Sequence, residues 1–184
     1  MKDTSVCGDS GVDESLLVDA ASHGVANAVV TVEGGKGKVP AHGPGTLDQK
    51  GCTYAPHVQA LPVGATLNIV NSDSVLHNVH SYNGDQTVFN AATPLTGMTK
   101  PVTLKAPGTL MIRCDVHNWM NAWVVVTDTP FFAVTDAGGK FSISGLAPGE
   151  YTLKVWHEKL APQEVKVTVP ADAGVSENLK LAAK

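Results

Sequence analysis

Residues 109–126 read TLMIRCDVHNWMNAWVVV, which is two short apolar runs joined by a polar loop that also carries sulfur. The runs are rich in β-branched and apolar residues, which favour strands over helices. In the loop, Cys114, His117 and Met120 follow one another with two residues between each neighbouring pair. This stretch therefore predicts a strand, a tight loop with three candidate metal ligands and a second strand, with none of the three ligands on a helix.

The rest of the chain repeats short apolar runs with period-two alternation between turn residues, which is typical of β-sandwiches. We expect strands at Ala26–Val32, Val58–Leu61, Ala65–Val70, His77–Tyr82, Thr87–Asn90, Pro101–Ala106, Thr109–Cys114, Asn121–Asp128, Lys140–Ser144, Tyr151–His157, Gln163–Val169 and Glu177–Ala182. About a dozen strands exceed what one small sandwich needs. The sequence therefore predicts an all-β protein with a Greek-key β-sandwich and a second, smaller β-sandwich.

The predicted domain division is not a simple head and tail. Residues 43–128 contain the candidate ligands and form one expected domain, whereas residues 1–42 and 129–184 form the other. The first 42 residues lack the pattern of candidate metal ligands and could contribute strands to either domain. We favour pairing of Ala26–Val32 with the C-terminal strands, which would make the metal domain an insertion.

Composition narrows the classes of function. The chain has 184 residues, of which 43% are apolar and 16% charged, which is typical of a globular protein. The formal net charge is −4 and Lys and Arg form no stripe, so nucleic acid and anionic membranes are poor partners. No run of 18 apolar residues occurs, so we expect no membrane span. Composition does not indicate an oligomeric state.

The three cysteines suggest one pair and one free thiol. If Cys114 binds a metal, Cys7 and Cys52 remain to form a disulfide, and two buried free thiols are the alternative. A disulfide would place the chain outside the cytoplasm, for instance in the periplasm. Met1–Ser5 has no apolar segment that could serve as a signal peptide, so we expect that any signal has been removed.

The ligand types select the metal. A thiolate and two imidazoles with a weak axial thioether form the blue-copper electron-transfer set, whereas structural zinc seldom takes methionine and iron–sulfur clusters mostly need four thiolates. The second imidazole must come from His77 or His80, which the sequence places three residues apart. On a strand these two side chains face opposite sides of the sheet, so only one can point at the metal.

Leu76-His77-Asn78-Val79-His80, followed by Cys114-x-x-His117-x-x-Met120, resembles the type 1 copper proteins called cupredoxins, such as amicyanin and plastocyanin. The resemblance covers roughly Tyr54 to Val126. It implies that His77, Cys114, His117 and Met120 bind one copper ion that cycles between Cu(I) and Cu(II).

The resemblance also implies roles for neighbouring residues. Asn71 is expected to make a hydrogen bond that fixes the loop beside Cys114. His117 is expected to reach the surface through an apolar patch, with Trp119, Pro94 and Leu95 helping to build it, where redox partners dock. The chain departs from the family pattern at Asp115, where Ser or Thr is usual, and at Trp119, where a smaller apolar residue is usual.

The segment Phe131–Val169 has a Gly-rich turn and then a Pro-Gly turn that leads into a Tyr-led strand. In this it resembles the carboxypeptidase regulatory-like (transthyretin-like) β-sandwich, whose members are usually scaffolds or adhesion spacers. The segment shows no nucleophile, base and acid set, and fold resemblance alone supplies no function.

Four protein ligands leave no open position for a substrate, so we expect an electron-transfer protein and not an enzyme. Two alternatives remain. The site could store or deliver copper, or it could belong to a copper enzyme in which an extra ligand or base comes from the region of His57.

Overall fold

The computed structural model describes residues 3–8 and 13–184, and their contacts divide them into two compact units. The residues up to Asp13 lie with Gly43–Val126 in the first unit, and Glu14–His42 lie with Thr127–Lys184 in the second. We had grouped the extreme N-terminus with the second unit. The structure places it in the first because Cys7 is bonded to Cys52. The division into a domain of residues 43–128 and a domain of residues 1–42 and 129–184 stays a prediction.

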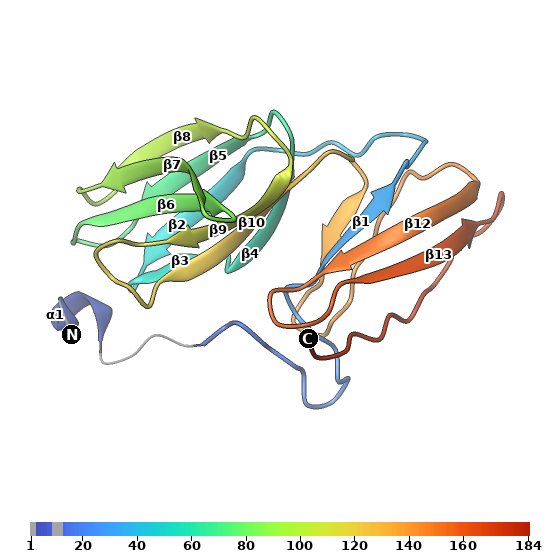
Figure 1. The fold of residues 1–184 in the computed structure, drawn as a ribbon, viewed down its shortest axis with the longest axis horizontal. Coiled ribbons are helices and arrows are strands. Elements are labelled where there is room, and N and C mark those ends of the chain that lie inside the picture. The colour runs from blue at the N-terminus through green and yellow to red at the C-terminus, as the bar shows by residue number, and fades with distance from the viewer. Residues whose placement is uncertain (1–2, 9–12) are drawn as a thin grey trace. The chain divides into compact units, whose positions relative to one another are not determined.

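The first unit is a β-sandwich, and Figure 1 shows its two sheets in cyan, green and yellow. One sheet has the order β4-β10-β9-β6-β7, with β4 at Val58–Pro62, β6 at His77–Asn83, β7 at Gln86–Thr93, β9 at Gly108–Arg113 and β10 at Asn121–Thr127. The other has the order β3-β2-β5-β8, with β2 at Gly45–Lys50, β3 at Thr53–Ala55, β5 at Thr66–Asn71 and β8 at Thr99–Thr103. Its core takes side chains from both sheets.

The strand order brings the candidate ligands to one end of this sandwich. Strand β9 lies antiparallel beside β6, with Arg113 opposite His80, although β7 and β8 intervene in the sequence. This return to an earlier strand is a Greek-key connection. Because the two strands are antiparallel, the end of β9, which leads to Cys114, lies at the same end as the start of β6 at His77.

The second unit contains one sheet of order β11-β1-β12-β13, with β1 at Val29–Glu33, β11 at Phe132–Val134, β12 at Gly149–Trp156 and β13 at Gln163–Val169. Strand β1, blue in Figure 1, pairs with both β11 and β12 although they follow it by about a hundred residues. The expected pairing of this N-terminal strand with the C-terminal strands is therefore found.

The second layer of this unit differs from expectation. We predicted strands at 140–144 and 177–182, but neither segment forms one. Both still contribute to the core, through Phe141, Ile143, Leu179 and Leu181, which pack against the sheet without joining a backbone ladder. Alternating apolar residues indicate that one side of a segment is buried. Burial of one side does not require the segment to pair with a neighbouring strand.

The all-β class is confirmed, and the strands in the described residues form three sheets. Strands β2, β3 and β11 were not predicted. In β2 the buried positions are Gly45, Leu47 and Gln49, so its inward face carries too little apolar character to give a strand signal. The helix in the described residues, α1 at Thr4–Cys7, spans a single turn. No helix in this part of the chain is long and apolar enough to cross a membrane.

Strand β9 offers a test of the core that supports the ligand loop. Ile112 is fully buried, whereas its neighbour Met111 faces the other side and is partly exposed. We expect Ile112→Ala to lower the free energy of unfolding of the first unit by about 2–5 kcal/mol, because it leaves a cavity. Met111→Ala is the matched control and should cost less. Urea unfolding followed by NMR signals of first-unit residues measures both, and equal losses would contradict the assignment of faces.

Candidate metal centre

Four side chains from one loop and one strand end lie close together at one end of the first unit. His77 opens β6, Cys114 follows β9, and His117 and Met120 lie in the turn before β10, where the Met120 N–H donates to the His117 carbonyl oxygen at 3.0 Å. The side chains of His77 and His117 have no exposed surface, and Cys114 and Met120 are at most 3% exposed. The site is therefore enclosed by the sandwich end.

The donor atoms of three of these residues converge. The Nδ1 atoms of His77 and His117 are 3.0 Å apart, and Cys114 Sγ lies 3.8 Å from His117 Nδ1. One nitrogen from each ring and the sulfur all lie within 4.8 Å of one another. Met120 lies nearby, in the same buried cluster as Cys114.

The outer nitrogens of both imidazoles face carboxylates. His77 Nε2 lies 2.9 Å from Asp73 Oδ2, and His117 Nε2 lies 3.1 Å from Asp3 Oδ2. An ionised carboxylate only accepts hydrogen bonds, so each Nε2 carries the proton and donates it. Each neutral ring then presents an Nδ1 lone pair to the interior.

This pairing has an electrostatic consequence. When both Nδ1 atoms are deprotonated and Cys114 is a thiolate, two nitrogen lone pairs and a sulfur lone pair point at one another in a buried space, where the low dielectric strengthens their repulsion. A cation between them removes the repulsion. The set of two imidazoles, one thiolate and a nearby thioether fits Cu(I) and Cu(II) in particular.

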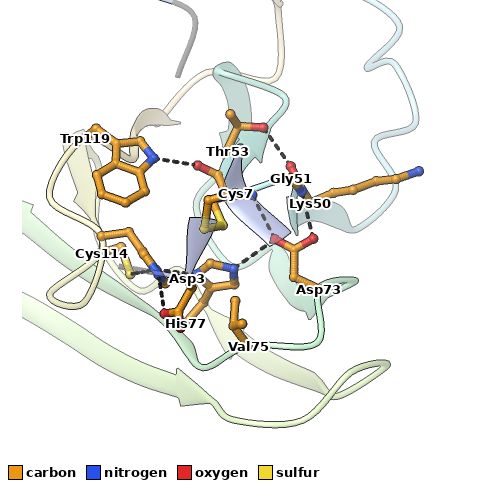
Figure 2. The surroundings of a disulfide bond; sticks show 12 residues. Asp3, Cys7, Lys50, Gly51, Thr53, Asp73, Val75, His77, Cys114 and Trp119 are labelled. Atoms are coloured by element: carbon orange, nitrogen blue, oxygen red, sulfur yellow. Dashed lines mark hydrogen bonds and ion pairs between the residues drawn. A yellow bond between two sulfur atoms is a disulfide. The ribbon is translucent and has the colours of Figure 1, made fainter. Parts of the chain in front are cut away.

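The Asp73 carboxylate is held in place by three hydrogen bonds. Besides the His77 ring, it accepts the backbone N–H of Gly51 at 2.7 Å and of Cys52 at 2.8 Å, and Figure 2 shows it between this turn and His77. Burial opposes its ionisation, but these hydrogen bonds outweigh burial and lower the pKa of Asp73. Asp73 therefore fixes the orientation of the His77 ring.

The environment also favours the thiolate form of Cys114. Burial alone would raise its pKa, but a hydrogen bond with His77 and backbone N–H groups of the loop outweigh burial and lower the pKa to about 6. A thiolate is the form that binds a metal. Burial likewise opposes protonation of His77, yet its hydrogen bonds with Cys114 and Asp73 give a net rise in its pKa.

The residue that fixes the loop beside Cys114 is Asn78, not Asn71. Asn78 Oδ1 accepts the Asp115 N–H at 2.8 Å and lies 3.4 Å from Cys114 Sγ, while its Nδ2 donates to Asp115 Oδ2 at 2.7 Å. Asn71 instead donates to the carbonyl oxygens of Val75 and Thr93 and accepts from Asp73 N–H, so it shapes the loop before His77. The resemblance to cupredoxins implied this role for Asn71, and the geometry corrects that prediction.

Two other histidines lie outside the cluster. His80 faces away from His77, contacts Asp115 Oδ1 at 3.0 Å and stacks on Tyr82 with ring centroids 4.2 Å apart. His57 is 6% exposed and belongs to none of the three His, Cys and carboxylate clusters found among residues 3–8 and 13–184. Neither adds a donor atom to the converging set.

The expected surface exposure of His117 is not what the structure has. His117 is fully buried, with Asp3 at its Nε2 and Trp119 against its ring at a centroid distance of 5.1 Å. Trp119 is partly buried and donates its indole N–H to the Cys52 carbonyl oxygen at 3.1 Å. Of the other two expected patch residues, Leu95 is 67% exposed and Pro94 is also exposed.

The Cys7–Cys52 disulfide is present and Cys114 is the free cysteine, as the odd count predicted. No pattern in the sequence predicts that the disulfide lies next to the site. Sulfur atoms of Cys7 and Cys52 lie within 4.8 Å of each other and of a His117 ring nitrogen. The i, i+4 spacing of Asp73 and His77 was a local signal for one carboxylate, whereas nothing in the sequence near Asp3 points to His117.

Comparison with known proteins bears on both units. Residues 119–182 match the family described as the carboxypeptidase regulatory-like domain, which is less than half of the chain. No curated protein sequence gives a significant match. The resemblance of the C-terminal segment to this domain, predicted from its turns, is thereby confirmed.

Several solved structures are similar to the chain. A Cu-containing nitrite reductase from Thermus scotoductus SA-01 is 25% identical with a TM-score of 0.42, over 52% of this chain and 24% of its own. A purple cupredoxin from Nitrosopumilus maritimus is 26% identical with a TM-score of 0.40, over 45% and 99%. Amicyanin from Paracoccus versutus is 21% identical with a TM-score of 0.41, over 53% and 97%. The chain thus spans about a quarter of the reductase, and the similarity to cupredoxins covers about half of the chain.

The lowered pKa of Cys114 is open to direct measurement. In the metal-free protein we expect thiolate absorbance to appear with a midpoint at about pH 6, because hydrogen bonds to the sulfur favour its charged form. The folded pKa is lower than the unfolded value of about 8.5, so thiolate formation stabilises the fold fully above about pH 8.5. That contribution is lost as the pH falls through about 6.

The control is Cys114→Ser, which should abolish the titration, because Cys7 and Cys52 are disulfide-bonded and do not ionise. A midpoint near the usual thiol value would show that the hydrogen bonds do not act on the sulfur as described.

Proposed function

We propose that the first unit binds one copper ion through His77, Cys114, His117 and Met120 and carries single electrons between redox partners. The observation that carries this proposal is the convergence of His77 Nδ1, His117 Nδ1 and Cys114 Sγ in an enclosed space. Bound copper would supply a one-electron Cu(I)/Cu(II) couple at that point.

The ligand residues are suited to electron transfer because they hold their positions independently of the metal's charge. Hydrogen bonds to Asp73 and Asp3 fix the two rings, and Asn78 fixes the backbone after Cys114. A thiolate and a thioether favour Cu(I), whereas imidazoles bind either state, so the set supports both oxidation states. Little movement of the protein is then needed when an electron arrives or leaves.

The same enclosure argues against a copper enzyme. A catalytic metal keeps a position open for water or substrate, whereas here four protein side chains surround the site. His57, the residue considered for an extra ligand, adds no donor atom to the cluster. A store or carrier of copper must release its ion, and a fully buried set of ligands with fixed rings is poorly suited to rapid release.

We further propose an extracytoplasmic location, because the Cys7–Cys52 disulfide requires an oxidising compartment to form and persist. The expected partners are redox proteins that bind briefly near the end of the sandwich where His117 lies. Weak electron-transfer encounters of this kind bury small interfaces.

Copper loading tests the proposal. We expect one Cu(II) per chain, with an intense visible absorption band from the thiolate and a small copper hyperfine splitting in electron paramagnetic resonance. Cys114→Ser should remove the intense band while leaving metal binding through nitrogen. Absorption and resonance spectra of the loaded proteins measure both.

His80→Ala is the matched control, since His80 lies on the same strand as His77 but faces away from the site. It should keep the band. A wild-type protein that shows only the faint colour of ordinary Cu(II) complexes would refute the electron-transfer site, and rapid loss of copper to a mild chelator would favour storage or delivery.

A further inference from the structure

The N-terminal segment Asp3–Gly8 lies against the outer edge of His117. The Asp3 carboxylate accepts from His117 Nε2 at 3.1 Å, and the disulfide of Cys7 with Cys52 lies within 4.8 Å of the same ring. Figure 2 shows Asp3 and Cys7 on the same side of the site as Cys114 and Trp119. Asp3 and His117 are 114 residues apart in the sequence.

Three contacts hold the segment, and they differ in strength. The disulfide is covalent and joins the segment to the turn after β2. Val6 and Cys7 pack against the core of the first unit but remain partly exposed. The single turn of helix at Thr4–Cys7 buries no residue fully. The disulfide is therefore the main fastening, and the Asp3 hydrogen bond is the contact that touches the proposed ligand.

We propose that Asp3–Gly8 is a disulfide-fastened cover over the edge of His117, and that Asp3 is a positioning residue for this ring. The contacts of this segment with His117 do not depend on the proposed copper function, but their effect on electron transfer rests on it. With the cover in place, His117 is fully buried and a partner protein has no direct contact with the ring. Loosening the cover opens the shortest route between a docked partner and the metal.

The turn that carries Cys52 couples the cover to the rest of the site. Cys52 N–H donates to Asp73, which holds His77, and the Cys52 carbonyl oxygen accepts from Trp119, whose ring contacts His117. The residue has a positive φ of 55°, a conformation that non-glycine residues seldom adopt, so this turn is shaped for these contacts. The cover is thus fastened to a turn that contacts the surroundings of both imidazoles.

The first experiment uses the copper-free protein, so its result does not depend on the metal. Modification of each histidine by diethyl pyrocarbonate is followed by mass spectrometry. In the wild type, His117 should react slowly and the exposed His23 quickly. In the double variant Cys7→Ala/Cys52→Ala, which leaves no stray thiol beside the site, we expect His117 to react at least about tenfold faster, because the rate follows the population of the open form.

Asp3→Ala keeps the disulfide and tests the hydrogen bond alone. We expect a rise of about tenfold in the His117 rate, which corresponds to about 1.4 kcal/mol. Asp3→Asn keeps an acceptor oxygen and should restore most of the protection. Thr4→Ala, at the exposed neighbouring position, is the matched control and should behave as the wild type.

The second experiment uses the copper-loaded protein. Electron self-exchange, measured by NMR line broadening in mixtures of Cu(I) and Cu(II) forms, should speed up by at least about tenfold when the cysteine pair is removed, because two copies can then approach at the ring edge. The remote-nitrogen signal of His117 in pulsed paramagnetic resonance should change in Asp3→Ala and be restored in Asp3→Asn.

The outcomes separate the two proposals. Unchanged His117 modification in both the double variant and Asp3→Ala overturns the cover, whether or not the wild type is blue. If the wild type lacks the blue spectrum but His117 reacts faster in the variants, the cover is supported and the electron-transfer function is refuted. If the buried His57 also becomes reactive in the double variant, the first unit has unfolded as a whole. The His117 modification rate in Asp3→Ala then tests the cover: a faster rate supports it and an unchanged rate overturns it.

Discussion

The convergence of two imidazole nitrogens and the Cys114 sulfur in a buried space is the constraint on which the end of the first unit depends. His77 Nδ1 and His117 Nδ1 are 3.0 Å apart, so the two nitrogens cannot both present lone pairs there without a proton or a metal cation between them. Each ring is oriented from behind by a carboxylate, and each carboxylate is itself held by the backbone or by the disulfide-bonded segment. The surroundings therefore hold the donor atoms together, and a cation bound between them would offset the cost of burying them.

The two carboxylates differ in how firmly they hold their rings, and this difference gives the site a rigid side and a soft side. Asp73 makes three hydrogen bonds from within a loop that is continuous with β5. Asp3 makes one to His117 and lies in a short segment that packs only partly against the core. Buried networks are strong when every member is satisfied, and Asp73 belongs to such a network. His77 is thus the more firmly held of the two candidate ligands, and we expect the enclosure to open first at the edge of His117.

The sequence predicted most of what short-range pattern controls. The strands beside the ligand loop, and the choice of His77 over His80, follow from alternation and spacing, because a pleated strand turns successive side chains to opposite faces. Strand β2 was missed because its inward face includes Gly45 and Gln49, and Gln49 is buried through hydrogen bonds to Val70 and Thr93 that only the folded chain supplies. At 140–144 and 177–182 the error is the opposite one: strands were predicted but none forms. The apolar alternation of these segments reflects packing against the sheet without backbone pairing.

The contacts around the candidate ligands were harder to predict because they join parts of the chain that are far apart. Asn78 and Asp115 meet across 37 residues, and Asp3 and His117 across 114. No periodicity records such a meeting, so the neighbour of Cys114 was misassigned to Asn71 and the enclosure of His117 was not foreseen. That enclosure changes the functional argument. Under the proposed function, an exposed histidine would let a partner contact the ring directly, whereas a covered one makes that contact depend on how often the N-terminal segment leaves the ring. Because Asp3 holds His117 Nε2 by a single hydrogen bond, we expect that this atom can be uncovered while the Cys7–Cys52 disulfide stays in place.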